Sequence, residues 1–172
     1  MTRLYLLRHA RAVRAAPRMD DFDRPLTEEG RQEARIIGKA MEAAGFVFDM
    51  AICSTAKRTR ETLEQLRPAL NLPFPIVDSR ELYSAGADEY LEIIREAAPA
   101  AASLLVIGHN PSIAELALML VGQGDPLALR RLSEGYPTAA LAVIDFHGPL
   151  AEAETGAGTL HAFITPDDIA DI

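Results

Sequence analysis

The sequence predicts an α/β fold in which one mostly parallel β-sheet lies between two layers of helices. Apolar runs of strand length alternate with segments of helical periodicity along most of the chain, a pattern typical of parallel sheets covered on both faces. The runs are continuously apolar, as strands buried on both faces are. A length of 172 residues also fits one domain. We therefore expect a single three-layer α/β/α domain over residues 1–172.

The first strand and helix follow each other near the N-terminus. The apolar run 4–7 ends abruptly in Arg8 and His9, as expected of a strand that emerges at the edge of a sheet. Thr27, an N-cap residue followed by two glutamates, starts a helix whose apolar positions continue at helical spacing until Gly45.

A second strand and helix come next, and the pattern then repeats. The run 50–53 has the length of a buried strand, and Ser54 with Thr55 is expected to cap a helix that ends at Pro68. Further strands are predicted over 75–77, 104–107, 139–146 and 160–164. Further helices are predicted over 90–97 and 113–121, and loops over 84–86 and 151–158. The last two strands can run antiparallel to the others.

Composition and charge exclude several classes of protein. The net charge of -8 argues against a nucleic-acid binder, because phosphate backbones are held by clustered lysines and arginines. The single cysteine, Cys53, excludes an intramolecular disulfide and a cysteine-based zinc site. The apolar run 4–7 is shorter than the core of a secretion signal, and no apolar stretch has the roughly 18 residues of a membrane span. We expect a cytoplasmic protein that binds no membrane.

Residues suited to phosphoryl transfer follow three of the predicted strands. Arg8 and His9 follow the first strand, and Arg58 lies just beyond the second. His109 follows the strand 104–107. In open α/β sheets ligands bind at the carboxyl ends of the strands. Imidazole nitrogen is a good nucleophile near neutral pH, and guanidinium groups match phosphate oxygens. The helix N-termini after Ser54 and His109 are expected to add backbone donors toward the same anion.

These residues resemble the histidine phosphatase superfamily, also called the phosphoglycerate mutase-like family, over nearly the whole chain. Residues 8–10 (Arg-His-Ala) look like its Arg-His-Gly signature, residues 53–62 like its second arginine motif, and residues 107–109 (Ile-Gly-His) like the region of its second histidine. Residues 24–27 (Arg-Pro-Leu-Thr) and 109–111 (His-Asn-Pro) are similar to the SixA-like phosphohistidine phosphatases. The resemblance implies a phosphoglycerate mutase-like fold.

The resemblance also implies roles for the matching residues. His9 is the expected nucleophile, which becomes phosphorylated, and the phosphoryl oxygens are expected to be held by Arg8, Arg58 and His109. The expected substrate is phosphohistidine in a protein. A small-metabolite phosphatase or mutase, and a phospho-ligand binding module without turnover, remain the alternatives. No cofactor and no metal are expected, since no histidine or cysteine spacing suits a metal site.

The chain departs from the family pattern at the signature glycine and at the general acid. Ala10 replaces the glycine and fits less well if that position needs positive φ. Larger members carry a glutamate where Ser84 stands, and another branch carries an aspartate where Asn110 stands.

Glu81 and Asp88 lie nearby in the sequence and are candidate substitutes for the general acid. The accessory candidates are Arg24, Glu81, Asp88 and Ser54. Residues 21–23 (Asp-Phe-Asp) resemble the motif of aspartate-dependent phosphatases but follow no buried strand, and we interpret them as a polar loop.

Overall fold

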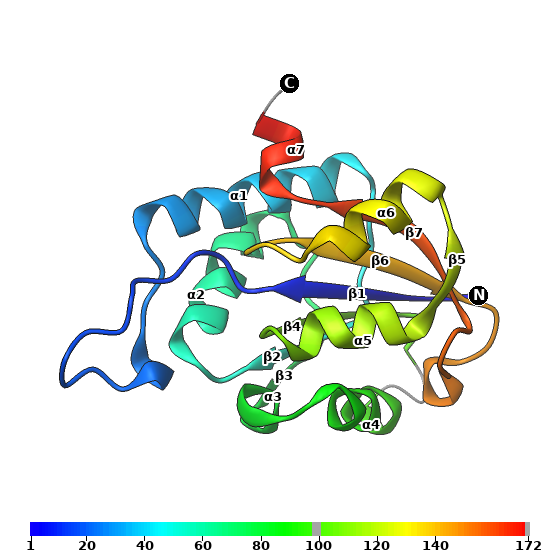
Figure 1. Cartoon of the computed structure of the whole chain (residues 1–172), viewed down its shortest axis with the longest axis horizontal. Coiled ribbons are helices and arrows are strands. Elements are labelled where there is room, and N and C mark those ends of the chain that lie inside the picture. Colours follow the sequence, from blue (N-terminus) through cyan, green and yellow to red (C-terminus); the bar gives the residue numbers. More distant parts are fainter. Residues whose placement is uncertain (98–100, 171–172) are drawn as a thin grey trace.

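The computed structural model describes residues 1–97 and 101–170, and one sheet runs through the whole of it (Figure 1). The strands of the described residues are β1 (Thr2–Arg8), β2 (Met50–Ser54), β3 (Ile76–Ser79), β4 (Ser103–Gly108), β5 (Val121–Gly124), β6 (Leu141–Phe146) and β7 (Gly158–Ile164). They lie in the order β3-β2-β4-β1-β6-β7-β5.

The sheet is mostly parallel, as predicted. Strand β4 pairs in parallel with both β1 and β2, while β2 pairs in parallel with β3, and β5 with β7. Strand β6 is antiparallel to both β1 and β7, so the expected antiparallel pairing near the C-terminus is also present. Because β2, β4 and β1 are parallel neighbours, their carboxyl ends meet at one edge of the sheet.

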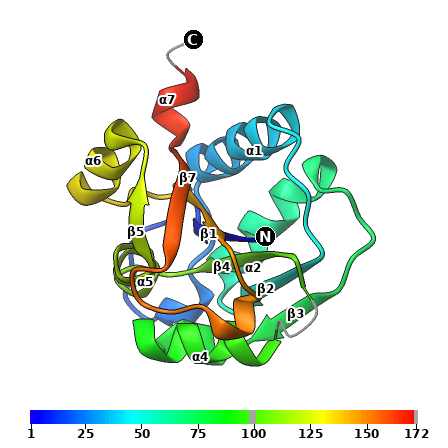
Figure 2. The same ribbon diagram turned by 90° about the vertical axis from the view of Figure 1, so that its right-hand side faces the viewer.

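Helices cover both faces of the sheet, which confirms the three-layer prediction. The α-helices of the described residues are α1 (Glu28–Ala43), α2 (Lys57–Leu66), α3 (Glu81–Ser84), α4 (Ala87–Ala97), α5 (Ser112–Leu120), α6 (Pro126–Glu134) and α7 (Pro166–Ala170). The same residues also form the short 3-10 helices η1 (Asp21–Asp23), η2 (Arg67–Ala69) and η3 (Leu150–Glu152). Figure 2 shows α1 and α2 on one side of the sheet and α4 and α5 on the other.

The central strands supply side chains to both faces in alternation. In β1, Leu4 and Leu6 join the apolar core under α4 and α5, whereas Tyr5 and Leu7 join the core under α1 and α2. Successive side chains of a strand point to opposite faces. A strand between two helical layers must therefore be apolar at every position, and this explains the continuous runs in the sequence.

The boundaries of α1 follow the predicted signals, but the expected cap of α2 is wrong. The Thr27 hydroxyl accepts a hydrogen bond from the Gly30 amide, and α1 ends before Gly45, which has φ of 69°. Helix α2 begins later than expected, and Ala56 occupies its N-cap without a side-chain hydrogen bond. The Ser54 hydroxyl accepts a hydrogen bond from the amide of Ala56 over 3.3 Å and also contacts a ring nitrogen of His109.

The structure differs from the prediction in the end of one helix, the assignment of Ser84 and the burial of one loop. Helix α5 stops at Leu120, and Val121 opens strand β5. Ser84 belongs to the short helix α3, although it was expected in a loop. The predicted exposed loop 151–158 contains the buried residues Ala153 and Gly158, because Ala153 packs in the core and Gly158 starts β7. Elements β5, α6 and α7 were not predicted.

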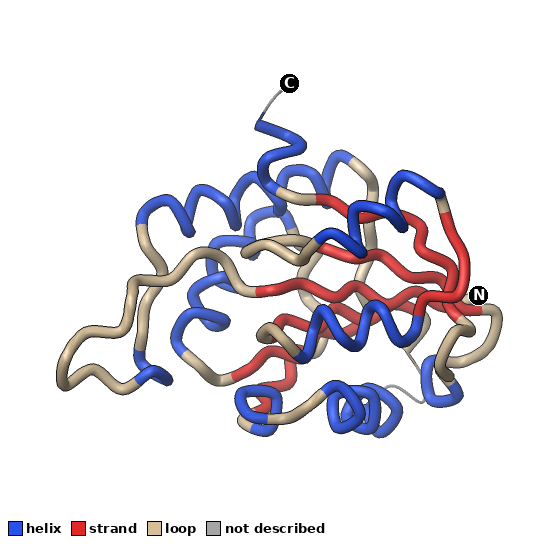
Figure 3. The backbone as a smooth tube through the Cα atoms, in the orientation of Figure 1, coloured by secondary structure: helices blue, strands red, loops and turns tan. Residues whose placement is uncertain are grey.

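The longest connection near the carboxyl edge is the loop between β1 and α1. It extends away from the sheet beyond the end of β1, and η1 lies within it (Figure 3). Residues 14–20 of this loop are exposed. The loop therefore places η1 beside the edge at which the predicted site residues emerge.

Candidate active site

The carboxyl edge of the sheet brings the predicted histidines together. His9 follows β1 and His109 follows β4, and their ring centroids lie 5.3 Å apart. Both side chains are almost completely buried, with 7% and 6% exposure. Arg8 is the last residue of β1, and Arg58 lies in the first turn of α2 with 6% exposure. Two histidines and two arginines thus share one edge of the sheet.

The ring of His9 is held in one tautomer. Its Nδ1 lies 2.7 Å from the carbonyl oxygen of Ala10. A carbonyl oxygen only accepts hydrogen bonds, so Nδ1 carries the proton and Nε2 keeps a free lone pair. Burial lowers the pKa of His9 to about 3, and the ring is neutral at pH 7. A neutral imidazole with a free Nε2 is the form that can act as a nucleophile.

His109 is positioned by Ser54 at the end of the neighbouring strand β2. Its Nε2 lies 2.7 Å from the Ser54 hydroxyl oxygen, whereas its buried Nδ1 has no hydrogen-bond partner among the described residues. Burial lowers the pKa of His109 to about 4, with a further contribution from the positive charge of Arg58. The candidate accessory residue Ser54 therefore contacts the site through His109.

The two arginines are anchored through their terminal nitrogens. Arg8 Nη1 donates to the Tyr136 carbonyl over 3.0 Å, and Arg58 Nη1 donates to the Asp21 carbonyl over 2.8 Å. The Nε atom of each arginine is buried without a hydrogen-bond partner in the described part of the chain. Buried unpaired donors are rare and call for an explanation such as a missing ligand. Their presence in both arginines is consistent with an anion site.

Asp21 is the main residue that the sequence analysis missed. Its carboxylate accepts hydrogen bonds from Arg58, Arg24 and the Tyr83 hydroxyl. The Tyr83 ring in turn lies edge-on to His109, with centroids 5.5 Å apart and an interplanar angle of 82°. The hydrogen bond from Tyr83 contributes most to lowering the pKa of Asp21, to about 2. Residues 21–23 do lie in the polar loop between β1 and α1, where they form η1, but the contacts of Asp21 with the site were not predicted.

The remaining accessory candidates fall outside this cluster or serve it indirectly. Arg24 donates to Asp21 and to the Val13 carbonyl, contacts that anchor the loop. Glu81 and Asp88 are exposed, and their side chains make no hydrogen bond or ion pair with other described residues. Among the described residues, no aspartate or glutamate side chain forms a hydrogen bond or ion pair with the ring of His9 or His109.

Alanine fits the position of the signature glycine. The backbone of Ala10 is not in the left-handed region, and its side chain is completely buried in the core under α1 and α2. Its amide donates to the Thr62 hydroxyl over 3.0 Å. The positive φ that would disfavour alanine is absent here.

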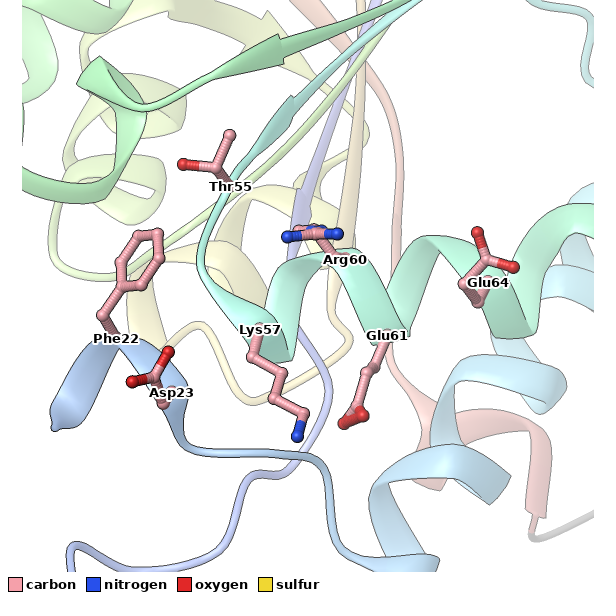
Figure 4. Close-up of a pocket in the computed structure, with 7 residues that line it drawn as sticks. All are labelled: Phe22, Asp23, Thr55, Lys57, Arg60, Glu61 and Glu64. Carbon is pink, nitrogen blue, oxygen red and sulfur yellow. The ribbon is translucent and has the colours of Figure 1, made fainter. Parts of the chain in front are cut away.

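A pocket of about 410 Å³ lies between η1 and α2. Figure 4 shows Phe22 and Asp23 from η1 facing Thr55 and Lys57, with Arg60, Glu61 and Glu64 further along α2. The two histidines do not line this pocket. It neighbours the site through the chain, because Phe22 follows Asp21 and Lys57 precedes Arg58.

The described residues show neither a side-chain cluster suited to a metal ion nor a helix suited to cross a membrane. Within residues 1–97 and 101–170, no three histidine, cysteine, aspartate or glutamate side chains gather in a way that could hold a metal ion. None of the helices in the same residues combines the length and apolarity that a membrane crossing requires.

Comparison with known proteins identifies the family. The model of the histidine phosphatase superfamily (branch 1) matches residues 4–83. A Mycobacterium tuberculosis protein of uncharacterised function is 33% identical over 162 residues, which cover 93% of this chain and 99% of that protein. The chain belongs to the histidine phosphatase superfamily. The matched segment contains Arg8, His9 and Arg58.

Solved structures of this superfamily extend the similarity over the whole fold. An Agrobacterium tumefaciens structure, provisionally assigned as a SixA phosphohistidine phosphatase, is 35% identical with a TM-score of 0.82, covering 96% of this chain and 98% of that one. The protein histidine phosphatase SixA complexed with tungstate is 25% identical with a TM-score of 0.73, covering 97% and 99%. The chain therefore has a SixA-like fold, and its family supports a phosphatase.

Proposed function

We propose that this histidine phosphatase superfamily member hydrolyses phosphohistidine in proteins through a covalent intermediate on His9. The observation that carries the proposal is the state of the His9 ring. Its Nδ1–H is fixed by the Ala10 carbonyl, and its low pKa keeps it neutral. The ring lies 5.3 Å from that of His109, and Arg8 and Arg58 emerge at the same edge of the sheet. The proposal takes the whole chain 1–172 as one catalytic domain.

The reaction proceeds in two displacements. In the first, His9 Nε2 attacks phosphorus, the bond from phosphorus to the substrate nitrogen breaks, and the leaving imidazole takes up a proton. In the second, water attacks the phosphorylated His9, which releases inorganic phosphate and restores the ring. Arg8, Arg58 and His109 stabilise the charge on the transferring oxygens, and donors of this kind commonly contribute about 100-fold to 1,000-fold in rate.

Phosphohistidine is favoured as substrate because the site offers no evident general acid. Asp21 is ionised at neutral pH, since its pKa is about 2, and Glu81 and Asp88 are exposed without contacts to the histidines. An alkoxide leaving group needs a proton donor, which contributes roughly 100-fold to 10,000-fold. Imidazole, with a pKa of about 6.5, takes its proton from water near neutral pH. The proposed partner is accordingly a phosphorylated protein.

The proposed chemistry needs no metal, because guanidinium and imidazole groups supply the positive charge. The binding of tungstate, a tetrahedral oxyanion, to the related SixA structure supports an oxyanion site in this fold. We expect vanadate to inhibit and activity to survive dialysis against EDTA. Loss of activity after EDTA that magnesium or zinc restores would contradict the metal-independent part of the proposal.

The covalent intermediate is tested by trapping. Protein mixed with a labelled phosphohistidine peptide and quenched in base should carry a base-stable, acid-labile label, which His9→Ala removes. Equal labelling of His9→Ala would refute His9 as the nucleophile. A wild-type protein that binds the peptide without releasing phosphate would point to a phospho-ligand binding module.

The substrate class is tested with a series of leaving groups. We expect kcat/KM to fall steeply as the leaving-group pKa rises across aryl and alkyl phosphates, with phosphohistidine peptides among the best substrates. Glu81→Gln and Asp88→Asn should leave the slope unchanged. A flat series would reveal a general acid, and a slope that becomes steep only in one of these variants would identify it, in favour of a small-metabolite phosphatase.

A further inference from the structure

Asp21 connects three separate segments of the chain around the candidate site. Its carbonyl accepts from Arg58 Nη1 over 2.8 Å, and its Oδ2 accepts from Arg58 Nη2 over 3.2 Å and from the Tyr83 hydroxyl over 2.6 Å. Its Oδ1 accepts from Arg24 Nε over 2.8 Å. Four hydrogen bonds from side chains thus converge on a residue whose own side chain is 49% exposed. Single surface ion pairs stabilise little, so the contacts of Asp21 matter mainly for where they hold Arg58.

We propose that Asp21 is a positioning residue, which holds the Arg58 guanidinium where that group meets the phosphoryl group of the substrate. The inference rests on the proposed function, because it requires Arg58 to bind the phosphoryl group. Asp21 would thus contribute to catalysis in addition to the two arginines and two histidines of the proposed function.

The contacts with Asp21 leave several hydrogen-bond donors of Arg58 free for a ligand. A guanidinium has five N–H donors, and Asp21 takes one from Nη1 and one from Nη2. No other hydrogen bond of the Arg58 side chain exists within the described residues, and its Nε is buried and unpaired. The remaining donors are free to hold oxygens of the substrate, while the Asp21 contacts fix the plane of the group. Tyr83 packs against the same guanidinium, with its ring centroid 5.7 Å from Arg58 Cζ.

The charge of Asp21 makes the proposal sharply testable. A carboxylate beside an anion site repels the anion, so a role through charge alone predicts that its removal strengthens binding of phosphate and vanadate. A positioning role predicts the opposite sign. Once the carboxylate is lost, Arg58 gains conformational freedom, and a misplacement of about 1 Å at such a site costs up to about 100-fold in rate.

The experiment measures kcat, KM and the inhibition constant of vanadate for Asp21→Asn and Asp21→Ala, with an aryl phosphate as substrate. We expect kcat/KM to fall by about tenfold to 100-fold and vanadate to bind more weakly, with little change in melting temperature. The matched control is Asp20→Asn, which removes one charge at the adjacent residue and keeps an oxygen for the Phe22 amide that Asp20 caps. This control should retain wild-type kinetics.

A double-mutant cycle separates this inference from the proposed function. Asp21→Ala should have no further effect in an Arg58→Ala background, because Asp21 acts through Arg58. Full activity of Arg58→Ala would contradict the assigned role of Arg58 and thus the proposed function itself. Where Arg58→Ala is impaired, unchanged or improved kinetics in Asp21→Asn would overturn the positioning role alone. An Asp21→Ala loss that adds in full to that of Arg58→Ala would overturn it too.

Discussion

At the scale of single residues, the site is organised by hydrogen bonds that fix the orientation of imidazole rings. The Ala10 carbonyl fixes the ring of His9 through Nδ1, and the Ser54 hydroxyl fixes that of His109 through Nε2. The carbonyl contact also fixes the tautomer of His9, because a carbonyl oxygen only accepts hydrogen bonds. Ser54 is completely buried, so no water replaces its hydroxyl without rearrangement.

Replacement of Ser54 by alanine is expected to reduce both activity and stability. The substitution leaves His109 Nε2 buried and unpaired, and such a loss destabilises proteins by about 1–3 kcal/mol. The freed ring should lower kcat/KM by roughly tenfold, which is less than the about 100-fold to 1,000-fold cost of removing a transition-state donor, because His109 itself is kept. Activity assays and thermal melts check both effects.

Ser103→Ala provides the matched control for this prediction. Ser103 is also buried and accepts a hydrogen bond through its hydroxyl, from the Asp49 amide, but it lies at the opposite end of β4. It should keep wild-type kcat/KM and lose less stability than Ser54→Ala, because the Asp49 amide also donates to the Ser103 carbonyl over 2.9 Å. Equal kinetic losses in the two variants would show that Ser54 acts through stability alone.

Residue-scale prediction from the sequence succeeded where a strand end dictated the position. His9, Arg58 and His109 come together because β1, β2 and β4 are parallel neighbours. Asp21 and Tyr83 were missed, because their contact joins residues 62 apart in the chain through an irregular loop. Hydrophobic periodicity gives no information about such a contact. The only signal in the sequence was the group of acidic residues just before Arg24.

At the scale of elements, sequence prediction depended on how deeply each element is buried. The central strands β1 and β4 read as continuous apolar runs and were predicted. Strand β5 was missed, because it is short, lies at the edge of the sheet and contains two glycines. Helix α6 did carry a readable signal, since Asp125 caps it and Pro126 occupies its first position. Helix α7 is only five residues long, too short to show a period.

The junction between β4 and His109 tolerates no side chain at Gly108. A Cβ atom there would lie 2.7 Å from the hydroxyl oxygen and 2.9 Å from a ring carbon of Tyr90, which is completely buried. The Tyr90 hydroxyl also accepts from the His109 amide over 3.2 Å. Displacing this ring therefore moves the backbone that carries His109.

We expect Gly108→Ala to lower the melting temperature and to reduce kcat. Overpacking of a filled core costs about 1–3 kcal/mol. The double variant Gly108→Ala/Tyr90→Phe removes the closest clashing atom and should recover part of the stability, and thermal melts of the single and double variants check this. Wild-type stability and kcat in the single variant would show that Tyr90 yields without displacing His109.

At the scale of the whole molecule, a protein of net charge -8 holds a cationic site at one edge of its sheet. Burial keeps the two histidines of this site neutral, and the positive charges of the neighbouring arginines oppose their protonation to a smaller extent. The folded state thus carries two histidines that cannot readily accept protons, whereas the unfolded chain carries two that can.

This difference predicts how global stability depends on pH. The pKa of His9 is about 3 and that of His109 about 4 in the folded state, and both approach about 6.5 on unfolding. Between these limits the unfolded state binds more protons, so the free energy of unfolding rises with pH and falls on acidification. The loss begins as pH drops through about 6.5, and each histidine contributes at most about 1.4 kcal/mol per pH unit.

Urea unfolding at pH 7.5, 6.5, 5.5 and 5.0 measures this dependence. The double variant His9→Asn/His109→Asn should show a flatter profile over this range, because it lacks both buried rings. The exposed His147 provides the control His147→Asn, which should keep the wild-type slope. Burial raises the pKa of Glu33, so protonation of Glu33 stabilises the folded state at the lowest pH and opposes the loss caused by the histidines. Because all variants keep Glu33, comparing them removes this contribution. A double variant with the wild-type slope would show that the two histidines take up protons in the folded protein as readily as in the unfolded chain.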